Sequence, residues 1–207
     1  MAVPSPFPKK DDFLNSLIEQ KKNLREEYRR RRDAFHSQLD AATRGLAFRR
    51  PASPLARLIE QSEIIALYST MGSEAPTGKL TEYCIEMGKM VAFPLVTGDS
   101  PMEFRHVDNV DLLENGFKDI PEPSTDCPLV TPDLIIAPVL AFDRSMGRLG
   151  QGAGHYDRTF EKYPQATRVG LAWSVQETDN VPLQPHDVTL EMIVTESEII
   201  QRVNKTS

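Results

Sequence analysis

The sequence predicts an α/β fold of three layers, with a central, mainly parallel sheet flanked by helices and a long helix near the N-terminus. Short apolar runs rich in β-branched residues alternate with helical patterns from about residue 54 onward, which is typical of sheets built from strand–helix–strand units. Residues 133–142 are almost entirely apolar, as expected of a strand covered on both faces. A long helical pattern without glycine or proline precedes these segments.

That first pattern covers residues 13–42. Its apolar residues recur mostly at spacings of three, four and seven, which marks one buried stripe; they are Leu14, Leu17, Ile18, Leu24, Tyr28, Phe35 and Leu39. Basic residues lie among them, including Lys21, Arg25 and the run Arg29 to Arg32. We expect the run to form a solvated basic face of the helix.

The remaining elements follow in order along the chain. Helices are expected over 54–61, over 78–87 with Gly88 as the C-terminal cap, and from the glycine-rich loop to about Pro164. Strands are expected over 63–69, 90–96, 102–107, 133–142, 168–174, 191–197 and 197–200. With 207 residues, 40% of them apolar, the chain can bury a core without disulfides or metals. We predict a single domain over 1–207, in which the proline-rich residues 1–12 form a disordered arm.

Composition excludes several classes of protein. The net charge is −6, although residues 1–50 contain 12 of the 24 Lys and Arg and only 7 of the 30 Asp and Glu. A uniformly basic nucleic-acid binder is therefore excluded. No apolar stretch approaches the roughly 20 residues of a membrane-spanning helix. With only two cysteines, we predict a protein of the reducing cytoplasm. We also predict a monomer that binds neither nucleic acid nor membrane.

The segment 143–157, DRSMGRLGQGAGHYD, carries the most chemical information. Its glycines fall at positions 147, 150, 152 and 154, after a buried strand and before a helix. Such spacing allows backbone N–H groups to converge on an anion beside the positive end of a helix. The spacing matches neither the Walker A nor the GxGxxG pattern. Composition alone leaves a phosphate loop and a tight surface turn equally open.

The longer string LIIAPVLAFDRSMGRLGQGAGHYDR resembles the signature of the 5-formyltetrahydrofolate cyclo-ligase family. The resemblance extends over most of the chain, through short motifs that occur in the family's order: KKNLR at 21–25, SEAPT at 73–77, IPEP at 120–123, Val175 with Gln176, and LQPHD at 183–187. It implies an enzyme that uses ATP and Mg²⁺ to convert 5-formyltetrahydrofolate to 5,10-methenyltetrahydrofolate, releasing ADP and phosphate.

The resemblance also implies roles for individual residues. Arg148 and Tyr156 would act in catalysis, and Asp157 and Asp187 would bind Mg²⁺. The reduced folate would contact Ser69, Glu74, Gln151 and Tyr156. ATP would contact Lys21, Arg25 and the loop formed by Arg148, Leu149, Gly150, Gln151, Gly152, Ala153, Gly154, His155 and Tyr156.

Simpler interpretations of these residues remain open. Lys21 and Arg25 could lie on the solvated helix face, Asp157 could cap a helix, and Asp187 could be an ordinary turn residue. Trp173 is interpreted as packing rather than as a ligand wall. Gln151 and His155 stand where aromatic residues are common in the family, and Val139 where glycine is frequent. These departures concern the folate contacts more than the ATP site.

Two other functions compete with the cyclo-ligase interpretation. One is a related ATP-dependent enzyme that acts on a different amide, and Glu74 is the residue that favours folate instead. The other is a non-catalytic protein whose basic N-terminal helix binds RNA or an acidic partner. The glycine loop and the two aspartates argue against that second alternative.

Overall fold

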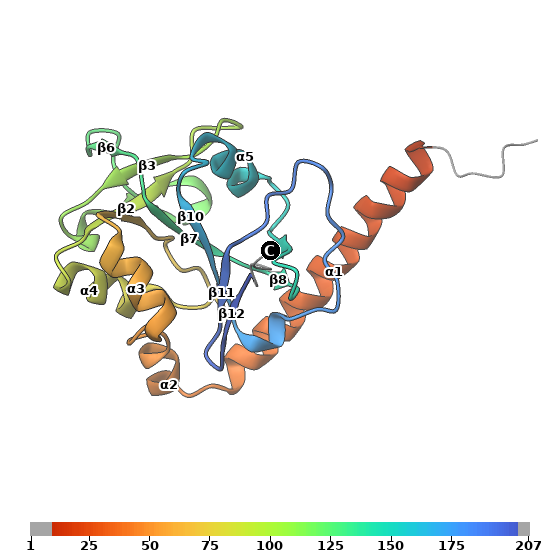
Figure 1. Ribbon diagram of the computed structural model, residues 1–207, viewed down its shortest axis with the longest axis horizontal. Coiled ribbons are helices and arrows are strands. Elements are labelled where there is room, and N and C mark those ends of the chain that lie inside the picture. Colours follow the sequence, from red (N-terminus) through yellow and green to blue (C-terminus); the bar gives the residue numbers. More distant parts are fainter. Residues whose placement is uncertain (1–9, 203–207) are drawn as a thin grey trace, which may run out of the picture.

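The computed structural model describes residues 10–202, and an eight-stranded sheet forms the centre of the fold (Figure 1). Its strand order is β12-β11-β10-β7-β1-β2-β3-β6. The five inner strands are parallel, whereas β12, β3 and β6 pair antiparallel at the edges. These strands are β1 (Ile64–Ala66), β2 (Met90–Leu95), β3 (Glu103–His106), β6 (Leu129–Val130), β7 (Leu134–Pro138), β10 (Thr167–Leu171), β11 (Met192–Val194) and β12 (Ile199–Gln201). The predicted α/β fold with a mainly parallel sheet is confirmed.

Helices cover both faces of the sheet. They are α1 (Lys10–Gln38), α2 (Ala41–Leu46), α3 (Ser53–Gln61), α4 (Gly78–Glu86) and α5 (His155–Lys162), with single 3₁₀ turns at η1 (Val110–Leu112), η2 (Phe117–Asp119) and η3 (Ser174–Gln176). Helices α3 and α4 pack on one face, and α5 packs on the other. Strand residues alternate between the two cores: Ile65 faces α3 and α4, and Ala66 faces the side of α5, as the two-residue period of a strand requires.

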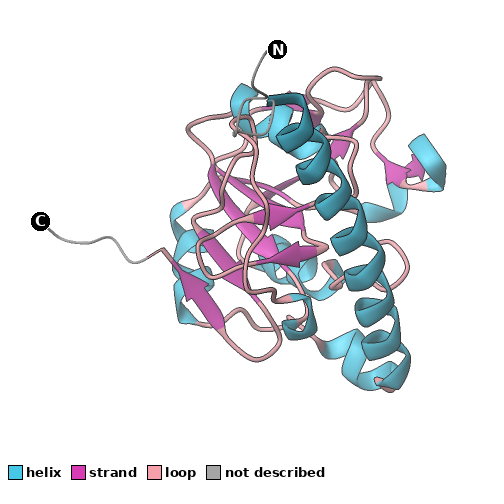
Figure 2. Cartoon of the chain, turned by 90° about the vertical axis from the view of Figure 1, so that its right-hand side faces the viewer, coloured by secondary structure: helices cyan, strands magenta, loops and turns pink. Residues whose placement is uncertain are grey.

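Helix α1 is the element that connects these parts. Tyr28 and Leu24 pack on a small hairpin beside the sheet, and Phe35 contacts the core under α3 and α4. Figure 2 shows α1 running along the height of the molecule, and Figure 1 shows its first turns extending beyond the body. The helix ends at Gln38 and not at residue 42 as predicted. The reason is that the Asp40 carboxylate accepts a hydrogen bond from Thr43 N at 2.7 Å and starts α2. At its N-terminal end α1 includes residues 10–12, which we expected in the arm; residues 1–9 of that arm lie outside the described range.

The predicted strand 133–142 is also divided. Strand β7 ends at Pro138, and the chain then forms a hairpin of β8 (Ala141–Phe142) and β9 (Arg148–Leu149). Asp143 holds its turn, because its Oδ1 accepts from the backbone N–H of Ser145 and Gly147 at 2.8 and 3.0 Å. The hairpin delivers the glycine-rich loop to the carboxyl end of β7. A second excursion, β4 (Glu114–Asn115) and β5 (Pro121–Glu122), leaves the sheet between β3 and β6. Within residues 10–202, no helix combines the length and apolar character needed to cross a bilayer.

Candidate active site

A cleft of about 970 Å³ opens at the carboxyl ends of the central strands. Its lining includes Ser69 after β1, Pro138 at the end of β7 and Val96 after β2. Ligands of open α/β sheets bind at this edge, where the chain leaves the strands. All the site residues that the sequence singled out line this one cleft: Lys21, Arg25, Ser69, Glu74, Arg148, Leu149, Gly150, Gln151, Gly152, Ala153, Gly154, His155, Tyr156, Asp157 and Asp187. Residues up to 166 positions apart in the chain are thus brought together, while their roles stay predictions.

The glycine loop between β9 and α5 has a backbone that requires glycine at two positions. Gly152 has φ +109° and Gly154 has φ +69°, values that residues with a side chain rarely adopt. Arginine side chains also pack against the loop: a Cβ on Gly152 would lie 3.3 Å from Arg25 Cζ, and one on Gly154 would lie 2.7 Å from Arg158 Nη1. The loop therefore places its backbone beside two guanidinium groups.

Lys21 and Arg25 turn from α1 into the cleft. Lys21 is 6% exposed, and its ammonium group donates to Asp187 Oδ2 at 2.5 Å and to Gln184 Oε1 at 3.2 Å. Arg25 Nε donates to the backbone oxygen of Gly150 at 3.0 Å. These contacts exclude the solvated-face interpretation for both residues. The Arg25 contact attaches α1 to the glycine loop, and the Lys21 contacts attach it to the segment that carries Asp187.

The two aspartates lie on the same wall of the cleft. Asp157 Oδ1 accepts from Arg148 Nη2 at 2.7 Å and from Val188 N at 3.3 Å, which places Asp157 against the segment that carries Asp187. Asp157 makes no capping bond at the start of α5, where Gly154 occupies the N-cap. Asp187 does brace its own turn, accepting from Gln184 N at 2.6 Å. Across the described part of the chain, no three His, Cys, Asp or Glu side chains gather into a metal-binding group.

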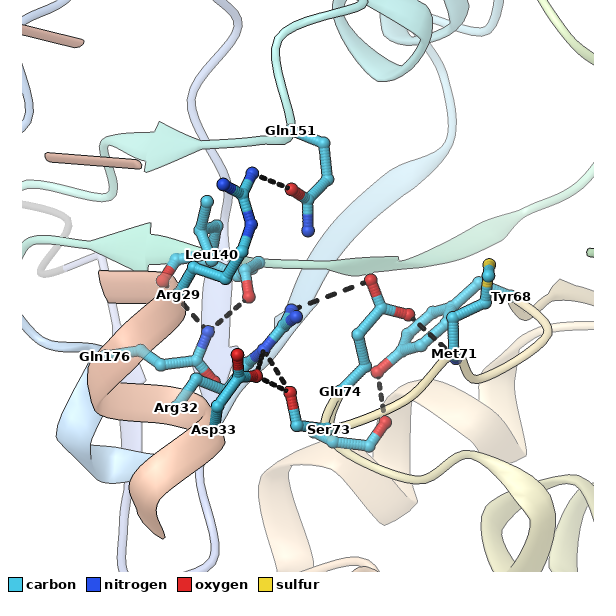
Figure 3. A network of polar contacts seen from close by, with 12 residues as sticks. Arg29, Arg32, Asp33, Tyr68, Met71, Ser73, Glu74, Leu140, Gln151 and Gln176 are labelled. Atoms are coloured by element: carbon cyan, nitrogen blue, oxygen red, sulfur yellow. Dashed lines mark hydrogen bonds and ion pairs between the residues drawn. The ribbon is translucent and has the colours of Figure 1, made fainter. Parts of the chain in front are cut away.

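Glu74 also lines the cleft, with 12% of its side chain exposed. Its Oε2 accepts from Met71 N at 3.1 Å, and its Oε1 lies 3.8 Å from Arg32 Nη1 (Figure 3). Burial raises the pKa of the Glu74 carboxyl above its ordinary value, whereas the Met71 N–H and the Arg32 charge lower this pKa. Burial, and next the Glu74 charge, also raise the pKa of the Tyr156 phenol. Nearby, the Ser69 hydroxyl donates to the backbone oxygen of Pro121 at 2.5 Å.

With this geometry in view, similarity to known proteins decides the family. The model of the 5-formyltetrahydrofolate cyclo-ligase family matches residues 17–196. The chain belongs to this family. It has the activity of the family and is an ATP-dependent ligase that acts on 5-formyltetrahydrofolate.

Individual cyclo-ligases agree with that assignment. A 5-formyltetrahydrofolate cyclo-ligase from Haemophilus influenzae is 33% identical over 144 residues, covering 64% of this chain and 76% of that protein. The one from Escherichia coli K12 is 29% identical over 150 residues, covering 68% and 82%. The solution structure of 5,10-methenyltetrahydrofolate synthetase from Aquifex aeolicus superposes with a TM-score of 0.73 at 26% identity, covering 90% of this chain and 95% of that one.

The prediction for Arg29 to Arg32 needs correction. Arg29, Arg30 and Arg31 are exposed as expected. Arg32 is only 7% exposed, and both it and Arg29 line the cleft; Arg29 Nη2 donates to Gln151 Oε1 at 2.9 Å. The signal was present in the sequence, because Arg32 follows Arg25 by seven residues and therefore falls on the same helix face.

Two other buried side chains shape the site of this cyclo-ligase. Trp173 is fully buried and donates to the backbone oxygen of Ser73 at 2.9 Å, which confirms that it is a packing residue. Gln176, which the sequence interpretation used only as a family motif, donates to the backbone oxygens of Val139 and Leu140 at 2.5 and 3.0 Å. Its amide therefore fixes the chain between β7 and β8, just ahead of the glycine loop.

Proposed function

We propose that this cleft closes 5-formyltetrahydrofolate to 5,10-methenyltetrahydrofolate by activating the formyl oxygen with the γ-phosphoryl group of ATP. The formyl oxygen attacks the γ-phosphorus and ADP leaves. N10 then attacks the formyl carbon and loses its proton, and the C–O bond breaks so that the oxygen departs in phosphate. The observation that carries the proposal is a single cleft that is lined both by a glycine loop with cationic side chains and by a buried carboxylate.

The glycine-loop end is suited to the triphosphate. Phosphoryl transfer depends mainly on positioning and on neutralising charge. Lys21 and Arg25 supply two cations from successive turns of α1, and Arg148 supplies a third. Arg148 is 6% exposed, and its Nε is buried without a hydrogen-bond partner among the described residues. A buried donor without a partner is costly, so a phosphate oxygen that accepts from it would be favoured.

Asp157 and Asp187 fit a magnesium ion that binds together with ATP. Mg²⁺ is usually held by one or two carboxylates plus substrate phosphates and water, so a cluster of three acidic side chains is not needed. Arg148 and Val188 both donate to Asp157 Oδ1, and Oδ2 is the oxygen we assign to the ion. Bound magnesium would neutralise charge on the phosphates. Asp157→Asn should lower turnover at least tenfold and raise the Mg²⁺ concentration required; unchanged turnover and Mg²⁺ dependence would contradict this role.

The opposite end is suited to the reduced folate. The pterin ring offers adjacent N–H donors, and the Glu74 carboxylate can accept from them. Tyr156 is half-buried in the wall between Glu74 and the glycine loop, where its ring can contact the folate close to the reacting formyl group. Gln151 and Ser69 complete the predicted contacts. Ser69 also holds Pro121 and thereby connects the substrate loop to the β4–β5 excursion.

The test is formation of methenyltetrahydrofolate, followed by its absorbance, with 5-formyltetrahydrofolate and either ATP, ADP or no nucleotide. Product should form only with ATP, and Gly152→Ala should abolish product formation because alanine is strained at φ +109°. The exposed Gly98, with φ +64° and no atom within 4 Å of an added Cβ, gives the matched control Gly98→Ala. Product formation without ATP, or RNA retention on a filter in place of catalysis, would contradict the proposal.

The proposal also covers the compartment of the protein and its oligomeric state. Both cysteines, Cys84 and Cys127, are free thiols, which supports a reducing compartment such as the cytoplasm. A relative from Arabidopsis thaliana is named as mitochondrial, so the compartment differs within the family. We expect a monomer that binds neither nucleic acid nor membrane, and light scattering with and without ATP would test the monomeric state.

A further inference from the structure

Arg32 is the least expected member of the cleft. It belongs to α1, the helix that also carries Lys21 and Arg25, but it lies at the Glu74 end. Its side chain is 9% exposed, and Nη1 is 3.8 Å from Glu74 Oε1 (Figure 3). At this distance the guanidinium acts on Glu74 through its charge, because the separation exceeds that of a hydrogen bond. Arg32 therefore favours the charge on Glu74 without occupying that oxygen.

The guanidinium is kept at this distance by a second set of contacts. Arg32 Nε donates to Ser73 Oγ at 2.9 Å, and the Ser73 hydroxyl in turn donates to Asp33 Oδ1. The Ser73 carbonyl is fixed as well, since it accepts from the Trp173 indole. Arg32 is thus hydrogen-bonded to the residue that precedes Glu74, and this contact holds its guanidinium beside the Glu74 carboxylate at ion-pair distance.

From these contacts we infer that Arg32 is a positioning residue that keeps Glu74 ionised and leaves Glu74 Oε1 available to the folate. The inference rests on the proposed function, because it assigns Glu74 to the substrate. It makes α1 a shared support for both substrates, with Lys21 and Arg25 at the nucleotide end and Arg32 at the folate end.

The electrostatic surroundings of Glu74 explain why such a residue is needed. Burial is the largest effect on the Glu74 pKa, and it raises this pKa. The charged and titratable groups facing Glu74 are Arg32 from α1, Tyr68 from the segment after β1 and Tyr156 from α5. Only Arg32 among them is a cation. Without it, the pKa of Glu74 would rise further, and the protonated carboxyl could not accept from two pterin donors at once.

The experiment compares Arg32→Gln with Arg32→Lys and with the control Arg30→Gln, which removes one charge from an exposed residue of the same helix outside the cleft. ADP release is followed between pH 6 and 8.5. We expect Arg32→Gln to move the acid limb of kcat/KM for folate to higher pH by roughly one unit, which would lower kcat/KM on that limb by up to about tenfold through a higher KM for folate. The KM for ATP should change little in Arg32→Gln. Arg32→Lys should recover most of the lost kcat/KM for folate, and Arg30→Gln should match the wild type.

A merely structural role would give a different pattern. It would lower kcat/KM for folate by the same factor at every pH, and this result would overturn the inference. In a Glu74→Gln background, Arg32→Gln should no longer shift the acid limb, because the titrating group is absent; a persisting shift would also overturn it. Should Arg32→Gln fail to fold, Ser73→Ala frees Arg32 to swing onto Glu74, and an unchanged KM for folate would count against the inference. An inactive wild type would instead refute the proposed function itself.

Discussion

At the scale of single residues, Glu74 decides which substrate the cleft accepts. A carboxylate that accepts hydrogen bonds from pterin donors contributes about 1.5–3 kcal/mol, and 1.4 kcal/mol corresponds to about tenfold in affinity. Glu74→Gln should therefore raise the KM for folate roughly ten- to a hundredfold. The KM for ATP should stay near the wild-type value, because the hydrogen bond and the ion pair of Glu74 join it to Met71 and Arg32 rather than to residues assigned to the nucleotide. Saturation curves for both substrates test this, and a loss confined to ATP would show that Glu74 is not the folate anchor.

Glu74 should also lower the free energy of unfolding at neutral pH. Burial raises the folded-state pKa of Glu74 above its unfolded value, so the folded state holds the carboxylate less readily than the unfolded state does. The penalty is absent at low pH, where the carboxyl is protonated in both states, and it develops as the pH rises past the unfolded pKa toward the folded one. Glu74→Gln should therefore raise Tm at pH 7.5 relative to wild type and raise it less at pH 4. An equal shift at both pH values would contradict this electrostatic origin.

At the scale of elements, α1 has two sides with different chemistry. Lys21 and Arg25 contact the glycine-loop side of the cleft, whereas Arg30, on the same helix, is exposed and outside the cleft. Lys21→Gln and Arg25→Gln should each raise the KM for ATP about tenfold or more, since charge-assisted hydrogen bonds to phosphate are strong. Arg30→Gln should change it less than about twofold, as is usual for solvated charges. An equal rise in the KM for ATP in all three variants would contradict this assignment and indicate a diffuse basic patch.

The elements also show where sequence patterns are sufficient and where they are not. The long apolar run 133–142 correctly indicated a central strand, but its length was misjudged. Strand β7 ends at Pro138, and the Gln176 amide then binds the backbone oxygens of Val139 and Leu140, a contact that no periodicity reveals. The basic run of α1 was interpreted from its charge alone. Charge does not distinguish Arg32 from Arg30; only the position on the helix face does, and the partner Ser73 is 41 residues away.

At the scale of the whole molecule, the cleft exists because three distant segments meet at one edge of the sheet. Strand order β10-β7-β1-β2 brings the Glu74 loop and the glycine loop to neighbouring strand ends, and α1 lies along both. The site residues could be named from the sequence because they follow family motifs in order. The contacts between Lys21 and Asp187, or between Arg32 and Glu74, could not be predicted, because they depend on how α1 packs against the finished sheet.

The central claim is that one cleft transfers the γ-phosphoryl group of ATP to the formyl oxygen before the ring closes. The direct measurement uses 5-formyltetrahydrofolate labelled with ¹⁸O in the formyl group, followed by mass analysis of the inorganic phosphate after a single turnover. We predict one ¹⁸O atom in each phosphate released, because the formyl oxygen leaves bonded to phosphorus. Phosphate without the label, formed together with methenyltetrahydrofolate, would contradict the account.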